Sequence, residues 1–172
     1  MKSTILKTRD NQTYPSHSIR TFTGKVFDVI NPTKEMIDII DIAHSLSLQC
    51  RFCGHTSRHV SIAEHSLWVA DHVPNELKLA ALLHDASEAY LVDVPTPIKN
   101  MLPAYRVMEK KLMTLIFEKY NAGKLTDVID YYDKVALQHE WDTYIVELLP
   151  KQEAKTHLYW EQLFLMKFYT LT

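Results

Sequence analysis

The sequence predicts an all-α protein that folds as one compact helical domain with a short extended segment near its N-terminus. Apolar residues recur at helical spacing through most of the 172 residues. Glycine occurs only three times, which argues against a turn-rich β architecture. No repeat, low-complexity segment or linker divides the chain, so residues 1–172 are expected to form a single domain.

The first half is expected to contain an irregular start, an extended piece and three helices. Residues 1–23 are polar, whereas residues 24–32 alternate enough for a short extended piece that ends at a proline. Apolar residues at helical spacing then predict a helix over 36–46. The expected elements that follow are a loop over 50–61, a helix over 63–73 that ends before Pro74, and a helix from residue 75 to about residue 90.

The second half is expected to contain three longer helices. The segment VDVPTPIKN has two prolines and is expected to be a shaped connection. An amphipathic helix is predicted over 103–120, with Gly123 after it as a stop signal. Thr126 is a plausible N-cap for a helix that reaches about residue 149, and the last helix is expected over 156–169.

The composition excludes several classes of function. The formal net charge is -2, so there is no strongly basic surface for duplex nucleic acid. The N-terminus has no apolar signal sequence and no segment is long enough to span a membrane, so we expect no membrane partner and a cytoplasmic location. Cys50 and Cys53 form a C-x-x-C pair without the further soft ligands that a structural zinc site needs, and we expect reduced thiols.

Residues that can bind metal are concentrated on three expected helices. His65 lies on the inward side of its helix, His84 and Asp85 follow a run of apolar residues, and Asp133 lies in a helix with an apolar side. Two imidazoles and two carboxylates can converge in the core of a bundle. Such a mixed set suits Co, Mn, Zn, Fe or Ni and does not select among them.

Spacing alone leaves other choices open for these ligands. A single histidine in an amphipathic helix is usually a hydrogen-bonded core residue. The alternatives that periodicity does not exclude are His44, His55, His59, His72 and His139, with Asp130 in place of Asp133.

The ordered motifs AEHS, LLHDASE and D-x-P-x-P-x-K, followed by a distal aspartate, resemble those of the HD-domain phosphohydrolases. The resemblance runs from about residue 24 to residue 140 and implies an HD-domain helical bundle. It also implies that metal is held by His65, His84, Asp85 and Asp133. Within the family, DIAHSL, RF-x-GHT and AEHS are most similar to small phage-encoded dATP triphosphohydrolases. Those enzymes release deoxyadenosine and triphosphate, and a phage origin would place this chain in the host cytoplasm.

The resemblance assigns further roles around the metal. Glu88, one turn after His84 and Asp85, suits a general base, and Asp93 resembles a second functional acid. Arg51 and Lys99 are candidates for binding phosphate, with His55 and His59 as weaker ones from the same loop as Arg51. Phe27 and Pro97 are candidates for an apolar slot that holds the base. Additional Mg is expected to accompany a triphosphate.

Three other functions remain open from the sequence. A 5'-deoxynucleotidase acting on dNMPs is the main alternative, because bacterial enzymes of this activity share the HDASE and P-x-P-x-K motifs. A catalytically silent nucleotide-binding module and a single-strand nuclease are weaker alternatives. The apolar residues of the last helix occupy more than one of its sides, which predicts a homo-oligomer.

Overall fold

The computed structural model describes residues 14–148 and 155–172. Within these residues the protein is helical apart from one small antiparallel sheet, so the all-α prediction is confirmed. The α-helices are α1 (Ile39–Leu48), α2 (Ile62–His72), α3 (Lys78–Leu82), α4 (Glu88–Leu91), α5 (Thr96–Lys99), α6 (Pro103–Tyr120), α7 (Asp127–Trp141) and α8 (His157–Leu171). Short 3₁₀ turns cover Lys34–Met36, Phe52–Gly54 and Asn75–Leu77, and a π-helical turn, Asp142–Val146, extends α7.

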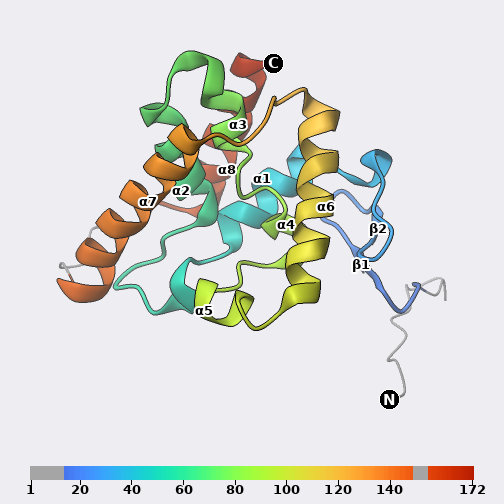
Figure 1. Cartoon of the computed structure of the whole chain (residues 1–172), viewed down its shortest axis with the longest axis horizontal. Helices are drawn as coiled ribbons and strands as arrows, with labels where there is room; N and C mark the ends of the chain where they lie inside the picture. Colours follow the sequence, from blue (N-terminus) through green and yellow to red (C-terminus); the bar gives the residue numbers. More distant parts are fainter. Residues whose placement is uncertain (1–13, 149–154) are drawn as a thin grey trace.

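The sheet pairs β1 (Ser18–Arg20) with β2 (Val26–Asp28). β2 lies in the expected extended piece, whereas β1 lies in the segment expected to be irregular. Ser18 pairs with Asp28 and Arg20 with Val26. The hairpin lies at the edge of the molecule, beyond α6 (Figure 1).

The core forms where α1 packs against both α2 and α8. Ile42, Leu46 and Phe164 are completely buried there. Two helices of the second half, α6 and α7, stand on opposite sides of this centre in Figure 1. They are joined at one end by the connection that contains Gly123.

Polar side chains fix where several of these helices begin. Asp38 accepts a hydrogen bond from the Ile40 N–H at 3.0 Å at the start of α1, and Ser61 accepts one from the Glu64 N–H at 3.1 Å at the start of α2. Thr126 caps α7, as the sequence predicted. These caps set the phase of α2 and α7, the two helices that carry His65 and Asp133.

The helix expected from residue 75 to about residue 90 is not continuous, and this prediction is wrong. α3 ends at Leu82, Leu83 has a non-helical conformation (φ -99°, ψ 6°), and α4 begins only at Glu88. His84 and Asp85 therefore lie in the turn between two short helices. The break falls in the motif that the sequence identifies as functional.

Candidate metal centre

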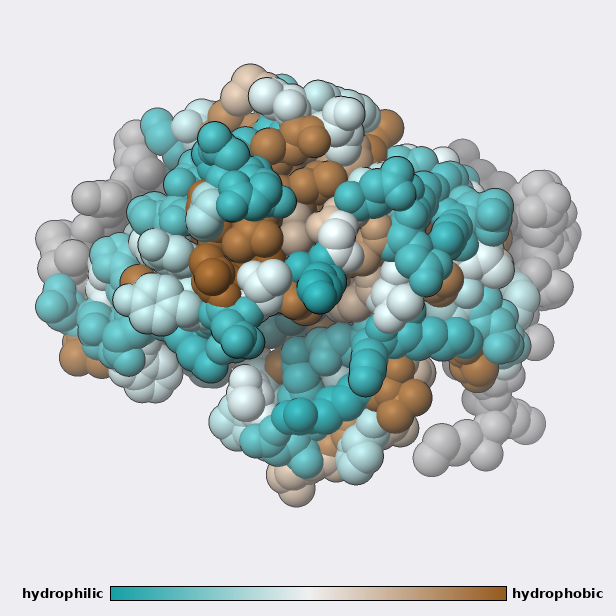
Figure 2. All heavy atoms as spheres, turned by 45° about the horizontal axis from the view of Figure 1, so that its top comes forward, coloured by the Kyte–Doolittle hydropathy of each residue, from teal (hydrophilic) through white to brown (hydrophobic). Residues whose placement is uncertain are grey.

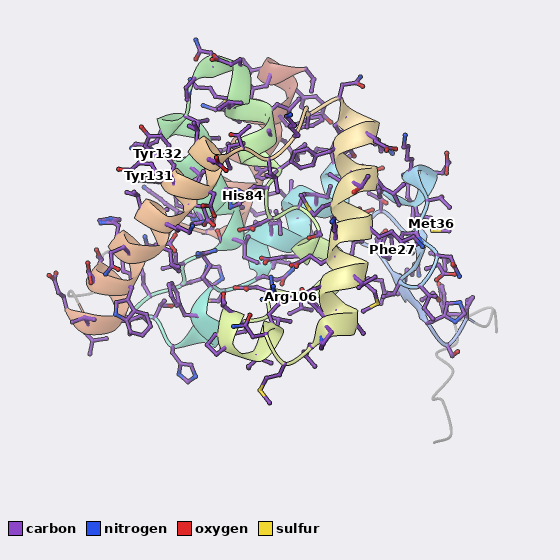
Figure 3. The ribbon with its side chains drawn as sticks, viewed as in Figure 1. Phe27, Met36, His84, Arg106, Tyr131 and Tyr132 are labelled. Carbon is purple, nitrogen blue, oxygen red and sulfur yellow. The ribbon has the colours of Figure 1, made fainter. Side chains whose placement is uncertain are left out.

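The four predicted metal ligands converge at one point in the structure. His65 Nε2 lies 3.0 Å from Asp133 Oδ1 and 3.7 Å from Asp85 Oδ2. His84 Nε2 lies 3.2 Å from Asp85 Oδ2 and 3.7 Å from Asp133 Oδ1. One ligand atom from each of His65, His84 and Asp133 falls within 4.8 Å of the others. Figure 3 shows His84 between α7 and α6.

The break after α3 explains how the neighbouring residues His84 and Asp85 reach the same point. On a continuous helix their side chains would diverge by about 100°. In the turn, the His84 ring folds back and its Nδ1–H donates to the Ala81 carbonyl at 2.7 Å. This bond satisfies a carbonyl at the end of α3 and directs Nε2 toward the Asp85 carboxylate.

The hydrogen bonds of both histidines leave Nε2 available as a ligand. His65 is completely buried, and its Nδ1–H donates to Glu140 Oε1 at 2.9 Å. A carbonyl and a carboxylate can only accept, so they favour the tautomer with a lone pair on Nε2. Among the described residues, the buried His84 Nε2 has no hydrogen-bond partner of good geometry. A nitrogen lone pair 3.0 Å from the Asp133 carboxylate requires a cation or a proton between the two atoms, and the donor set fits a divalent transition metal.

The pKa values of the cluster reflect mutual stabilisation of opposite charges. Burial lowers the pKa of His84, but the carboxylates of Asp85 and Asp133 outweigh it and hold that pKa well above its usual value. Burial raises the pKa of Asp85 and Asp133, but the neighbouring imidazoles hold both pKa values well below the usual range. In the metal-free protein both carboxylates are therefore charged at neutral pH and His84 holds a proton, which a bound metal would displace to use the Nε2 lone pair.

Arg51 lies beside this cluster, as the resemblance implied. Its side chain is buried, with Nε 2.7 Å from Glu140 Oε2 and Nη1 3.7 Å from Asp85 Oδ2. Glu140 thus receives hydrogen bonds from both His65 and Arg51. A single carboxylate connects a predicted metal ligand to the predicted phosphate-binding cation.

Glu88 is buried next to the cluster. Among the described residues, its carboxylate forms no ion pair with either of the two imidazoles. Burial together with the charges of Asp85 and Asp93 raises the pKa of Glu88 to about 9. Its Oε1 lies 3.6 Å from Lys99 Nζ, and its Oε2 has no hydrogen-bond partner in the part of the chain that the structure describes. A buried carboxyl of this kind can hold or release a proton beside the metal ligands.

Lys99 lies on α5 and is already paired with acids. Its Nζ is 2.6 Å from Glu109 Oε1, a residue of α6. Burial lowers the pKa of Lys99, but Glu109 and Glu88 outweigh this and raise it. Lys99 is therefore a charged group within reach of Glu88, the predicted base.

Asp93 is oriented by an unusual backbone at the preceding residue. Val92 has φ 70° and ψ 145°, a combination that β-branched residues rarely adopt. The Tyr105 hydroxyl donates to the Val92 carbonyl at 2.6 Å, and the Asp93 N–H donates to the Gln49 side chain at 3.2 Å. Burial raises the pKa of Asp93 more than Arg51 lowers it. These contacts hold Asp93 near the charges of the cluster.

The structure does not bring the remaining predicted site residues to the cluster. Phe27 is completely buried and stacks on Tyr90 with ring centroids 4.2 Å apart. In Figure 3 it lies on the other side of α6 from His84. Pro97 and His55 are exposed, and His59 Nε2 lies 3.3 Å from the Leu48 carbonyl.

The alternative ligands also lie elsewhere. His44 contacts Glu161, with Nδ1 and Oε2 3.0 Å apart, and His72 stacks on Trp68. Asp130 pairs with Lys134; it lines the cavity next to the cluster but is not grouped with His65, His84 and Asp133. His139 is exposed. Cys50 is partly buried and Cys53 is exposed, and neither forms a disulfide within the described residues.

Sequence reasoning missed Glu140. The residue follows Asp133 by seven positions, which is two helical turns, so both side chains emerge from the same face of α7. That spacing is the signal by which it could have been found. Glu109 was also missed, because its partner Lys99 is on another helix.

Among residues 14–148 and 155–172, none of the helices has the length and apolar character that crossing a bilayer requires.

Comparison with known proteins identifies relatives but no activity. The uncharacterized protein YfdR of Escherichia coli strain K12 is 43% identical over 123 residues, which cover 71% of this chain and 69% of YfdR. An uncharacterized protein of Rhodobacter capsulatus, RCAP_rcc00048, is 40% identical over 89 residues, covering 46% of this chain and 45% of that protein. No family model matches the sequence.

Proposed function

This chain belongs to the same protein family as YfdR, and we propose that it is a metal-dependent deoxynucleotide phosphohydrolase with an HD-type centre. The single observation that carries the proposal is the convergence of His65, His84, Asp85 and Asp133, with both Nδ1 atoms occupied and both Nε2 atoms turned inward. The order and identity of these residues match the HD-domain pattern described above.

In this proposal the four residues hold a divalent ion chosen among Co, Mn, Zn, Fe and Ni. When bound, such an ion acidifies water and polarises a phosphoryl group. Glu88 would accept the proton of the attacking water in its ionised form, which the positive charge of a bound ion favours over the protonated form that burial favours. Arg51 orients a phosphate oxygen, and Glu140 fixes the direction of its guanidinium.

The preferred substrate in this proposal is dATP, cleaved to deoxyadenosine and triphosphate, with Mg accompanying the outer phosphates. Lys99 and Arg51 supply positive charge on the side of the cluster that faces α5. The substrate preference depends on the sequence motifs shared with the phage-type triphosphohydrolases.

One observation favours a 5'-deoxynucleotidase as the second candidate. Arg51 is paired with Glu140 and Asp85, and Lys99 is paired with Glu109 and Glu88. Cations already neutralised by acids suit a monophosphate better than a triphosphate, which carries more charge.

Product analysis tests the proposal. Purified protein is incubated with dATP, ATP or dAMP and with added Co, Mn, Zn or Mg, and the products are separated by chromatography. We expect deoxyadenosine plus triphosphate, with dATP hydrolysed faster than ATP. Stepwise dADP and dAMP, or hydrolysis of dNMPs alone, would replace the first candidate by the second. No hydrolysis of any nucleotide by metal-loaded protein would refute both.

We also propose that the protein forms a homo-oligomer through α8. Phe164 and Phe168 of this helix are buried in the core. On its outer side, Met166 and Tyr169 are each 60% exposed, and Leu158 is 54% exposed. Apolar side chains gathered on one exposed helix face are typical of an interface.

A further inference from the structure

A cavity of about 380 Å³ opens directly from the candidate metal centre, between α6 and α7. Its lining includes the predicted ligands His84, Asp85 and Asp133. The apolar side chains of Met113, Leu125 and Ile129 also line it, as do the charged side chains of Glu109, Lys110 and Asp130. Its volume lies in the range of about 300–1,000 Å³ typical of small-molecule sites.

A second hollow of about 620 Å³ continues the cavity along α6. The two share Lys110, Met113 and Leu125 in their walls. This part of the molecule is at the top of Figure 1, and Figure 2 turns it toward the viewer. On that face, apolar patches reach the surface among hydrophilic side chains (Figure 2).

The surroundings of the metal ligands are therefore different on their two sides. Arg51 and Lys99, the cations paired with the acids of the cluster, do not line the cavity. Beyond the ligands the cavity wall is mixed: the apolar side chains of Met113, Leu125 and Ile129 line it together with Glu109, Lys110 and Asp130, and Met113 and Leu125 also line the second hollow. A nucleotide has the same division, because its phosphates are anionic and its base is a flat ring with an apolar face. Thioethers also make favourable contacts with aromatic rings.

We infer that the cavity between α6 and α7 binds the nucleoside half of the substrate, with the base against Met113 and Leu125, while the phosphates extend toward Arg51 and Lys99. This inference rests on the proposed phosphohydrolase function. It replaces the sequence-based assignment of the base to Phe27 and Pro97. Phe27 is completely buried in the core, where a base cannot reach it, and Pro97 does not line the cavity.

Two half-substrates test the inference separately. Deoxyadenosine probes the nucleoside side and inorganic triphosphate probes the phosphate side, each as a competitive inhibitor of dATP hydrolysis. Deoxyadenosine binding is also measured by calorimetry, which does not require turnover. The test variant is Leu125→Trp, because Leu125 is 52% exposed and a larger side chain there narrows the cavity without entering the core. Val107→Trp on α6 is the matched control, because Val107 is 70% exposed and lines neither hollow.

We expect Leu125→Trp to weaken deoxyadenosine binding at least about tenfold and to leave triphosphate inhibition unchanged. Lys99→Ala should do the reverse, and Val107→Trp should change neither. If Leu125→Trp does not fold, which circular dichroism would reveal, Met113→Ala gives the decisive comparison, with the same expected direction.

The possible failures are distinguishable. Normal dATP hydrolysis with unchanged deoxyadenosine binding in the folded cavity variant would overturn the cavity assignment alone. Absence of hydrolysis and of binding of either probe in the metal-loaded wild-type protein would overturn the proposed function, and the inference with it.

Discussion

Glu140 connects a predicted metal ligand to a buried arginine, so replacing it should affect both metal binding and stability. Its Oε1 accepts from His65 Nδ1 at 2.9 Å and its Oε2 accepts from Arg51 Nε at 2.7 Å. Loss of a carboxylate that orients a ligating histidine typically lowers metal affinity about 10–100-fold. That range corresponds to about 1.4–2.7 kcal/mol.

The stability effect depends on the replacement. Glu140→Ala leaves the Arg51 guanidinium buried with only the more distant Asp85, 3.7 Å away. Removing one partner of a buried ion pair lowers the free energy of unfolding by about 3–5 kcal/mol. Because the Asp85 carboxylate remains, we expect a loss of about 3 kcal/mol here. A protein of this size would then melt about 6–12 °C lower. Glu140→Gln keeps an acceptor of similar shape, so this replacement should lower the free energy of unfolding by less, about 1–2 kcal/mol.

The assay measures the two effects separately. Melting in the presence of a chelator reports the Arg51 contribution without stabilisation by metal. Metal affinity is measured by competition with a chromophoric chelator. Glu147→Gln, an exposed acid beyond the same helix, serves as the control. Wild-type melting and wild-type metal affinity in Glu140→Gln would refute the role assigned to this residue.

The remaining predictions concern the metal ligands, the base, one pH effect and assembly. Each single alanine replacement of the four predicted ligands should remove bound metal and hydrolysis, and full metal content in Asp133→Ala by elemental analysis would contradict its role. Glu88→Gln should retain metal by the same analysis but lose about 10²–10⁴-fold in kcat; near-normal turnover would exclude a base at this position. The pKa of Asp38 is lowered, because Lys25 and the Ile40 N–H outweigh burial, so its stabilising effect is complete above about pH 4–5 and disappears as pH falls through the lowered pKa. Asp38→Asn should therefore melt below wild type at pH 7 but approach it near pH 3; a constant difference would contradict this sign. Met166→Glu should shift the protein toward the monomer in light scattering, whereas a monomeric wild-type protein would refute the proposed assembly.

Much of the fold was predictable because periodicity and capping determine it locally. The helix expected over 103–120 agrees with α6, and Thr126 caps α7 as predicted. The strand β1 could not be recognised, because its polar sequence forms a strand only by pairing with β2. Cross-strand pairing is a tertiary effect that local propensity does not contain.

The helix break after Leu82 shows a second limit of sequence reasoning. The run AALLHDASEAY has no glycine or proline, so propensity favours a continuous helix. The break brings His84 and Asp85 to one point, and it depends on contacts with α2 and α7 that are far away in sequence. Residue types and motif order nonetheless predicted which side chains lie together at this point. Glu140 was missed although its spacing from Asp133 places it on the same face of α7, because its partners His65 and Arg51 are far from it in the sequence.

The backbone at Val92 has a consequence for anyone who wishes to make this protein more robust. A β-branched residue held at φ 70° stores about 1–3 kcal/mol that glycine would not. Val92→Gly would release that energy and also let the chain before Asp93 sample many orientations. A screen that selects for heat resistance alone would therefore favour Val92→Gly. The selected variants would no longer hold Asp93 in its present orientation. Selecting for retained turnover after heating would keep the valine.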